Sequence, residues 1–119
     1  SIYDKLPFQK VEKMNQENNI NKRKKTKEEE EYIEIKRDLY IENILDMENK
    51  IKKLEINYNV QDLKGLKNDI EYRNITIESE LYKPNNSYGK MDDEVLEIFD
   101  ERLKNLRERL ETLESKYQW

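Results

Sequence analysis

Apolar residues near the C-terminal end recur at alternating steps of three and four, the spacing that places side chains on one side of an α-helix. The resulting stripe is narrow, and coiled-coil helices bury such an a/d seam by knobs-into-holes packing. The sequence therefore predicts a heptad helix within residues 92–119. Its seam consists of Leu96, Phe99, Leu103, Leu106, Leu110, Leu113 and Tyr117.

A second seam with the same spacing lies in a helix that we expect to run from about Lys27 to Asn57. Thr26 and Glu29 have the spacing of a capping box, in which the two side chains bind free backbone amides of the first turn. This pair predicts the start of the helix. The second seam consists of Tyr40, Ile44, Met47, Ile51 and Leu54.

Turn signals divide the rest of the chain. A break near 57–60 is predicted at Asn57, and Asn59 can cap a further helix that ends near Tyr82. Residues 83–91 contain Pro, Asn and Gly and are predicted to be a loop. We therefore expect an all-α fold, an extended helical hairpin or coiled coil. Its segments are an arm (1–25), a broken helical region (26–82), the loop and the C-terminal helix (92–119).

The composition suggests that both seams are partner interfaces. Only 34% of the 119 residues are hydrophobic, whereas 42% are charged. Ordering each residue costs about 1–2 kcal/mol, which apolar burial must offset. We therefore expect helices of a partner to supply burial, and the isolated chain not to be a stable monomer. Ile35, Leu39 and Ile41 lie off the second seam and widen its apolar face, which suits contact with more than one neighbour.

The N-terminal arm is predicted to be basic and largely irregular, because Pro7 prevents a continuous helix through Leu6. Two interpretations stay open for it. One is a solvated tail. The other is a docking segment in which Tyr3, Leu6 and Phe8 anchor in the groove of a partner.

Charge is distributed in blocks. Residues 1–27 hold eight Lys or Arg and three Asp or Glu, a net charge of +5, whereas residues 28–58 carry −5 and residues 92–119 carry −4. A run of four cations lies directly before the predicted N-terminus of the first helix. The helix dipole disfavours cations at that end, so helix stability does not explain the position of this basic run. A solvated charge run, a nuclear-import patch and a phosphate contact are the three interpretations. The run consists of Lys22, Arg23, Lys24 and Lys25.

Missing residue types limit the possible chemistry. The chain has no His and no Cys, which excludes imidazole bases, thiol nucleophiles and the usual zinc sites. Two glycines are too few for a phosphate-binding loop. No apolar run approaches the roughly 18 residues of a membrane span. We therefore expect no enzyme activity, metal, cofactor, small-molecule substrate or membrane partner.

The segment Ile35–Tyr40, followed by apolar residues at helical spacing, resembles a known family. It is similar to the helical region of the defective-silencing suppressor and breast-cancer metastasis suppressor family, over about residues 31–119. Members are coiled-coil subunits of SIN-type histone deacetylase corepressor complexes. The segment Val60–Leu63 falls where the second helix of the family opens. The resemblance implies a scaffold subunit that works in the nucleus and contributes to transcription repression.

The leading hypothesis is therefore a non-catalytic bridging subunit that binds other helical proteins. Two other functions are alternatives to it. One is an accessory coiled-coil subunit of another large assembly, mitochondrial, cytoskeletal or kinetochore, which would place the chain in the mitochondrion or cytoplasm. The other is a basic-armed nucleic-acid binder. It is less favoured because the predicted helical part is acidic, so nucleic acid is not expected to be the main partner.

Overall fold

Three helices make up the described part of the chain, residues 24–117 of a computed structural model, and this part contains no strand. The all-α fold class is thereby confirmed. The arm residues Tyr3, Leu6 and Phe8 lie outside the described residues, as does the first half of the basic run, Lys22 and Arg23. The helices are α2 (Lys27–Ile56), α3 (Val60–Tyr82) and α4 (Asp93–Tyr117).

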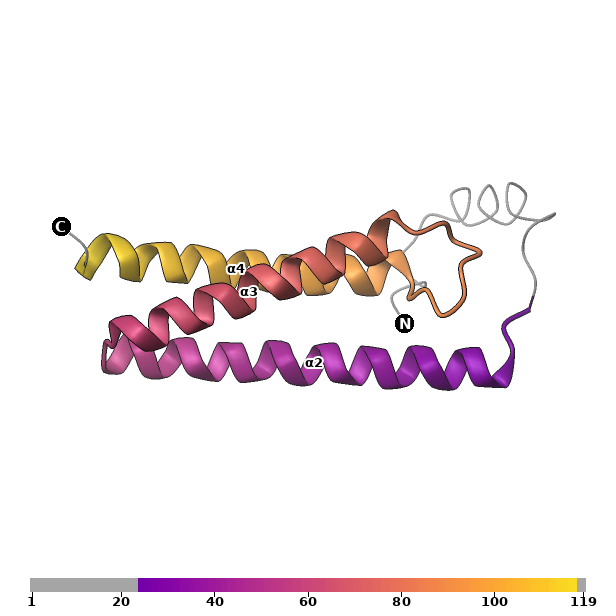
Figure 1. The fold of residues 1–119 in the computed structure, drawn as a ribbon, viewed down its shortest axis with the longest axis horizontal. Helices are drawn as coiled ribbons and strands as arrows, with labels where there is room; N and C mark the ends of the chain where they lie inside the picture. The colour runs from indigo at the N-terminus through magenta and orange to yellow at the C-terminus, as the bar shows by residue number, and fades with distance from the viewer. Residues whose placement is uncertain (1–23, 118–119) are drawn as a thin grey trace.

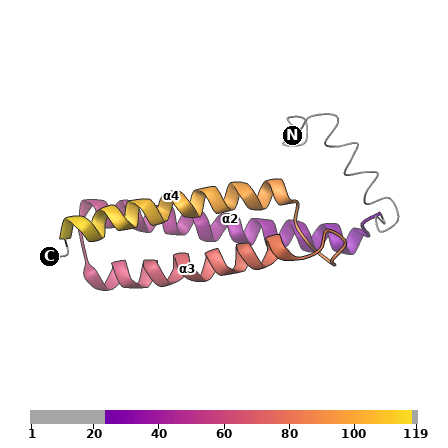
Figure 2. The same ribbon diagram turned by 90° about the horizontal axis from the view of Figure 1, so that it is seen from above.

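The helices form an antiparallel three-helix bundle (Figure 1). The chain reverses at the short turn between α2 and α3, and α4 then runs back along both (Figure 2). Each helix packs against the other two. The arrangement is thus more compact than a hairpin of two helices.

Local capping sets where the first two helices begin. The Thr26 hydroxyl accepts a hydrogen bond from the backbone N–H of Glu29 at 3.1 Å. The side-chain oxygen of Asn59 accepts from the N–H groups of Gln61 and Asp62, at 2.9 and 3.0 Å. Each cap satisfies backbone donors that the first helical turn leaves free. Both caps lie where the sequence predicts them.

The helices bury both predicted seams against one another, together with apolar residues of α3 and the following loop. This corrects the expectation that the seams form a partner interface: α4 folds back onto α2 and α3, so the core of this chain already occupies those positions. Tyr117 is the exception, because it is 39% exposed and stacks on Tyr58 with ring centroids 4.1 Å apart. The buried seam residues are Tyr40, Ile44, Met47, Ile51, Leu54, Leu96, Phe99, Leu103, Leu106, Leu110 and Leu113; Leu63, Leu66, Ile70, Ile77 and Met91 complete the core.

Polar contacts between helices line the edges of the core. Arg102 binds Glu48, and Arg109 binds Glu55, through two nitrogen–oxygen contacts each. These two pairs lie seven residues apart on both α2 and α4, so they repeat along one edge of the bundle. Such partly exposed ion pairs contribute about 0–1 kcal/mol each, and they favour this alignment of the helices.

The two glycines are expected to respond to Ala in opposite directions. Gly89 has a φ of +69°, and an added Cβ would fall on the Tyr32 ring. Gly89→Ala should therefore destabilise the fold by more than about 1 kcal/mol. Gly65 lies inside α3 with no atom within 4 Å of an added Cβ, so Gly65→Ala should stabilise it by about 0.5–1 kcal/mol. Urea unfolding of both variants checks the prediction, and a shift of the same sign for both would contradict it.

Candidate protein-interaction face

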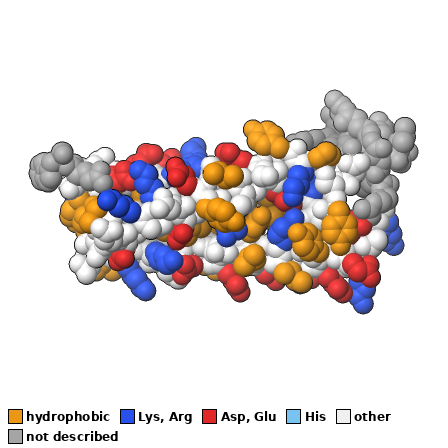
Figure 3. Space-filling view, in the orientation of Figure 1, with side chains coloured by type: hydrophobic (Ala, Val, Ile, Leu, Met, Phe, Trp, Pro, Cys, Tyr) orange, Lys and Arg blue, Asp and Glu red, His pale blue; other side chains and the backbone are white. Residues whose placement is uncertain are grey.

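Large apolar side chains are exposed on both α2 and α3. Tyr32, Ile35 and Leu39 are 46%, 68% and 50% exposed, and their spacing of three and four places them on one flank of α2. On α3, Tyr72 and Ile75 are each 64% exposed. Figure 3 shows several separate hydrophobic groups, with cations among them, on the half of the molecule nearest the α3–α4 loop. We call these five residues the α2–α3 face.

Arg73 lies within this face, and two tyrosine rings hold its guanidinium. Its central carbon is 5.0 Å from the ring centroid of Tyr40 and 5.5 Å from that of Tyr72. Among residues 24–117, no carboxylate lies within ion-pairing distance of it. Cation–π contacts orient the group while leaving its N–H donors available. Arg73 is thus a positioned donor that a carboxylate of another segment can bind.

A buried carboxylate supports the α2–α3 face from below. Glu80 is only 3% exposed, and it accepts hydrogen bonds from Lys36 at 2.7 Å, Lys83 at 3.0 Å and the backbone N–H of Met91 at 3.2 Å. Burial alone raises the pKa of Glu80, but these three donors outweigh burial and hold the pKa below its ordinary value. The cluster joins α2 and α3 to the segment that leads into α4.

The α3–α4 loop is held against the same end of the bundle. The buried ammonium of Lys90 donates to Asp93 at 2.8 Å and to Asn85 at 2.9 Å. The Tyr88 ring lies 5.8 Å from the Tyr32 ring, and Lys36 lies 4.9 Å above the Tyr32 ring. These contacts place Tyr32 between the loop and α2. The loop therefore fixes one end of the α2–α3 face.

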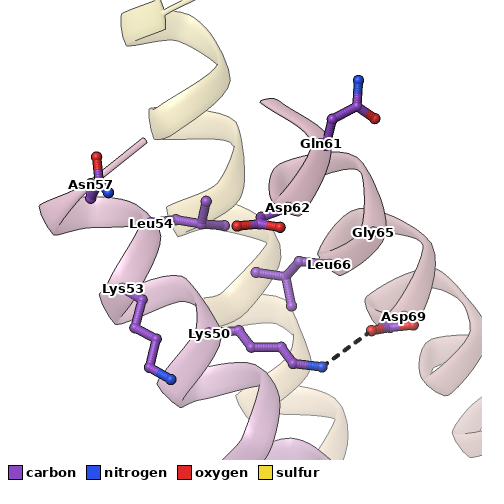
Figure 4. A pocket seen from close by; sticks show the side chains of 9 residues that line it. All are labelled: Lys50, Lys53, Leu54, Asn57, Gln61, Asp62, Gly65, Leu66 and Asp69. Carbon is purple, nitrogen blue, oxygen red and sulfur yellow. Dashed lines mark ion pairs between the residues drawn. The ribbon is translucent and has the colours of Figure 1, made fainter. Parts of the chain in front are cut away.

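A groove of about 340 Å³ lies between α2 and α3 at the opposite end, near their turn (Figure 4). Leu54 and Leu66 form its apolar floor, and Lys50 pairs with Asp69 across it at 3.8 Å. Its charged residues are two Lys and two Asp, so it favours neither anions nor cations. The groove thus lies between the same two helices as the α2–α3 face, but at the other end of them. Its lining consists of Lys50, Lys53, Leu54, Asn57, Gln61, Asp62, Gly65, Leu66 and Asp69.

The structure separates the residues that the sequence singled out. The seams are core, whereas the off-seam residues Ile35 and Leu39 are exposed and belong to the α2–α3 face. Ile41, the third off-seam residue, is partly buried against the core. Of the basic run, Lys24 and Lys25 are described and exposed, and Lys25 lies 3.8 Å from Asp92.

Sequence reasoning missed Glu80 and the role of Arg73. A local signal existed for the α2–α3 face, because Tyr32 precedes Ile35 by three residues and so extends the off-seam stripe. No local signal existed for Glu80, whose partner Lys36 lies 44 residues away in the chain. Only the packing of α2 against α3 brings the two charges together.

Two further observations concern the kinds of site within residues 24–117. No group of three or more acidic side chains in this part of the chain is arranged to hold a metal ion. No helix here combines the length and apolar character needed to cross a membrane.

Comparisons with models of known protein families, with curated proteins and with solved structures found no match for this chain. The function is accordingly inferred from the geometry of the α2–α3 face.

Proposed function

We propose that this chain is a non-catalytic helical scaffold subunit that binds a helix of another protein through the α2–α3 face. The observation that carries the proposal is the exposure of five large apolar residues beside a core that is already filled. An apolar patch rimmed by polar residues is typical of protein interaction sites. Tyr and Arg are also the residue types most enriched among those that dominate binding energy.

The geometry favours a helical partner. Two helices that lie side by side present a groove along their axes, and an amphipathic helix can lay its apolar side into it. A partner helix there would complete a four-helix arrangement with α2, α3 and α4. Arg73 would bind a carboxylate on that helix, in a charge-assisted hydrogen bond stronger than a neutral one.

A role in a nuclear histone deacetylase corepressor complex is the more specific form of this proposal. Its support is the sequence resemblance over Ile35–Tyr40, whose exposed members Ile35 and Leu39 lie on the α2–α3 face. The alternative is an accessory subunit of a mitochondrial, cytoskeletal or kinetochore assembly, which would use the face in the same way. The absence of His and Cys from the whole sequence supports a non-catalytic role in either case.

Polar substitution of the face is the test of this function. Ile35, Leu39 and Ile75 would be changed together to Ser in the full chain, which would then be used to capture partners from cells. We expect the recovery of the partner that the unchanged chain captures in stoichiometric amount to fall at least about tenfold. Buried apolar surface contributes about 25 cal/mol per Å², and we expect the three changes to remove more than about 1.4 kcal/mol of binding free energy, which is a tenfold change in affinity. Binding of the purified partner to both chains would confirm that the contact is direct.

A matched control uses exposed apolar residues outside the face. Leu45, Ile56 and Ile98 are 46%, 88% and 45% exposed and lie outside the face, so their change to Ser should leave partner binding unchanged. If the control variant lost the partner and the face variant kept it, the binding surface would lie elsewhere. If both variants captured the same partner as well as the unchanged chain, the proposed function of the α2–α3 face would be refuted.

A further inference from the structure

We infer that two copies of this chain pair antiparallel, so that the α2–α3 face of each copy covers the groove near the α2–α3 turn of the other. The face and the groove lie along the same two helices, at opposite ends of them (Figure 1, Figure 4). A two-fold axis midway between them brings each feature of one copy onto the other feature of the second copy, and every contact then occurs twice. The inference concerns the surface of the proposed function, but it requires no other protein.

Charge selects the antiparallel arrangement. The parts of α2 and α3 toward the α3–α4 loop, residues 27–46 and 69–82, hold four Lys or Arg and twelve Asp or Glu, a net charge of −8. Residues 47–68, which form the turn end, hold five Lys or Arg and three Asp or Glu, a net charge of +2. Parallel copies would bring the two acidic ends together, whereas antiparallel copies set the acidic end of each on the basic end of the other. At 0.1 M salt such charges act over about 10 Å, which is close to the distance between packed helices.

One register of α2 on α2 of the second copy suits both the apolar and the charged residues. Antiparallel helices align residues whose numbers have a constant sum, and one such alignment sets Leu39 opposite Lys53, which lines the groove. The same alignment sets the exposed Glu42 opposite Lys50. The two-fold axis then passes beside Asp46, whose charge the Lys50 ammonium of its own chain offsets at 2.9 Å. The steps of three and four between these residues place them on one side of α2.

The groove has room for side chains of a second copy. Its volume is about 340 Å³, and Leu54 and Leu66 form its apolar floor. Gly65 keeps its wall open, because no atom of residues 24–117 lies within 4 Å of a Cβ added there. Glycine inside a helix lowers helix stability relative to Ala, and the packing of this bundle does not require it. The close approach of a second copy gives this glycine a reason that the fold of one chain does not.

Disulfide cross-linking of the full chain tests the orientation, because the sequence has no Cys of its own. Asp46→Cys places a thiol beside the two-fold axis, so oxidation should join two copies through it. Leu39→Cys and Lys53→Cys should each cross-link poorly alone. An equal mixture of these two variants should form the 39–53 disulfide in at least about fivefold higher yield, since a disulfide needs its two Cα atoms within about 7 Å.

A charge exchange between copies tests the register by sedimentation. Glu42→Lys and Lys50→Glu each place like charges opposite one another in a dimer of identical variants, so each variant alone should dimerise at least about tenfold more weakly. In an equal mixture, each pair of opposed residues again has opposite signs, and dimerisation should recover. Circular dichroism of each variant checks that its helices are intact.

Ile98→Cys is the matched control, because Ile98 is exposed on α4, outside the paired surfaces, and should give no cross-linked product above background. A monomeric unchanged chain at about 100 μM, self-cross-linking of Leu39→Cys and Lys53→Cys without a 39–53 product, or an equal yield from Ile98→Cys would each overturn the inference. So would a charge-exchange mixture that dimerises no better than its components. A monomer that captures another protein would overturn only this inference, whereas a dimer that captures none would refute only the proposed function.

Discussion

Leu106→Ala is expected to lower the free energy of unfolding by about 2–5 kcal/mol, the usual cost of truncating a buried leucine. Leu106 is 1% exposed and lies in the middle of α4, between the core residues Leu103 and Leu110. Total stabilities of small domains are about 5–15 kcal/mol, so this one change removes a large fraction. Urea unfolding followed by circular dichroism measures the loss.

Leu45→Ala is the matched control, because Leu45 is 46% exposed on α2. Its effect should stay within about 0.5 kcal/mol, as is usual for surface positions. The pair also separates the two roles that the sequence allows for the C-terminal seam. If Leu106→Ala released a partner without changing the unfolding midpoint, the seam would be an interface between chains, and the bundle would not be the fold of the isolated chain.

Glu80→Gln is expected to destabilise the bundle by about 3–5 kcal/mol, because removing one partner of a buried ion pair leaves the other charge uncompensated. The Lys36 ammonium is that charge, with a side chain only 11% exposed. Lys83→Met is the matched control, since Lys83 binds the same carboxylate from a side chain that is 45% exposed. Its loss should cost about 0–1 kcal/mol.

The pH dependence of unfolding gives an independent measurement of the same site. The folded-state pKa of Glu80 is below its ordinary value, so the native protein binds fewer protons there than the unfolded chain does. The resulting stabilisation is present above the ordinary glutamate pKa and is lost as pH falls through the folded-state pKa. The unchanged protein should therefore lose stability on acidification more steeply than Glu80→Gln does. Equal slopes in this acidic range would show that Glu80 does not make the described contacts in solution.

Helix boundaries could be predicted from the sequence because their causes are local. Thr26 and Asn59 cap α2 and α3 through backbone amides within three residues of each cap. The β-branched residues 75–77 favour a strand by local propensity, and they are helical in the structure. Ile77 is fully buried there, so core packing outweighs the small helix-propensity penalty of these residues.

Heptad spacing determined which side of α2 and α4 is apolar, and therefore which residues are buried together. It did not determine what buries them. An a/d stripe has the same spacing whether it faces a helix of its own chain or one of another chain, and only the return of α4 over α2 and α3 decides between the two. The same packing leaves Ile35, Leu39 and Tyr72 exposed and brings Lys36 to Glu80. Residues far apart in the chain share these contacts, so the candidate site follows from tertiary structure, whereas the helices follow from local spacing and capping.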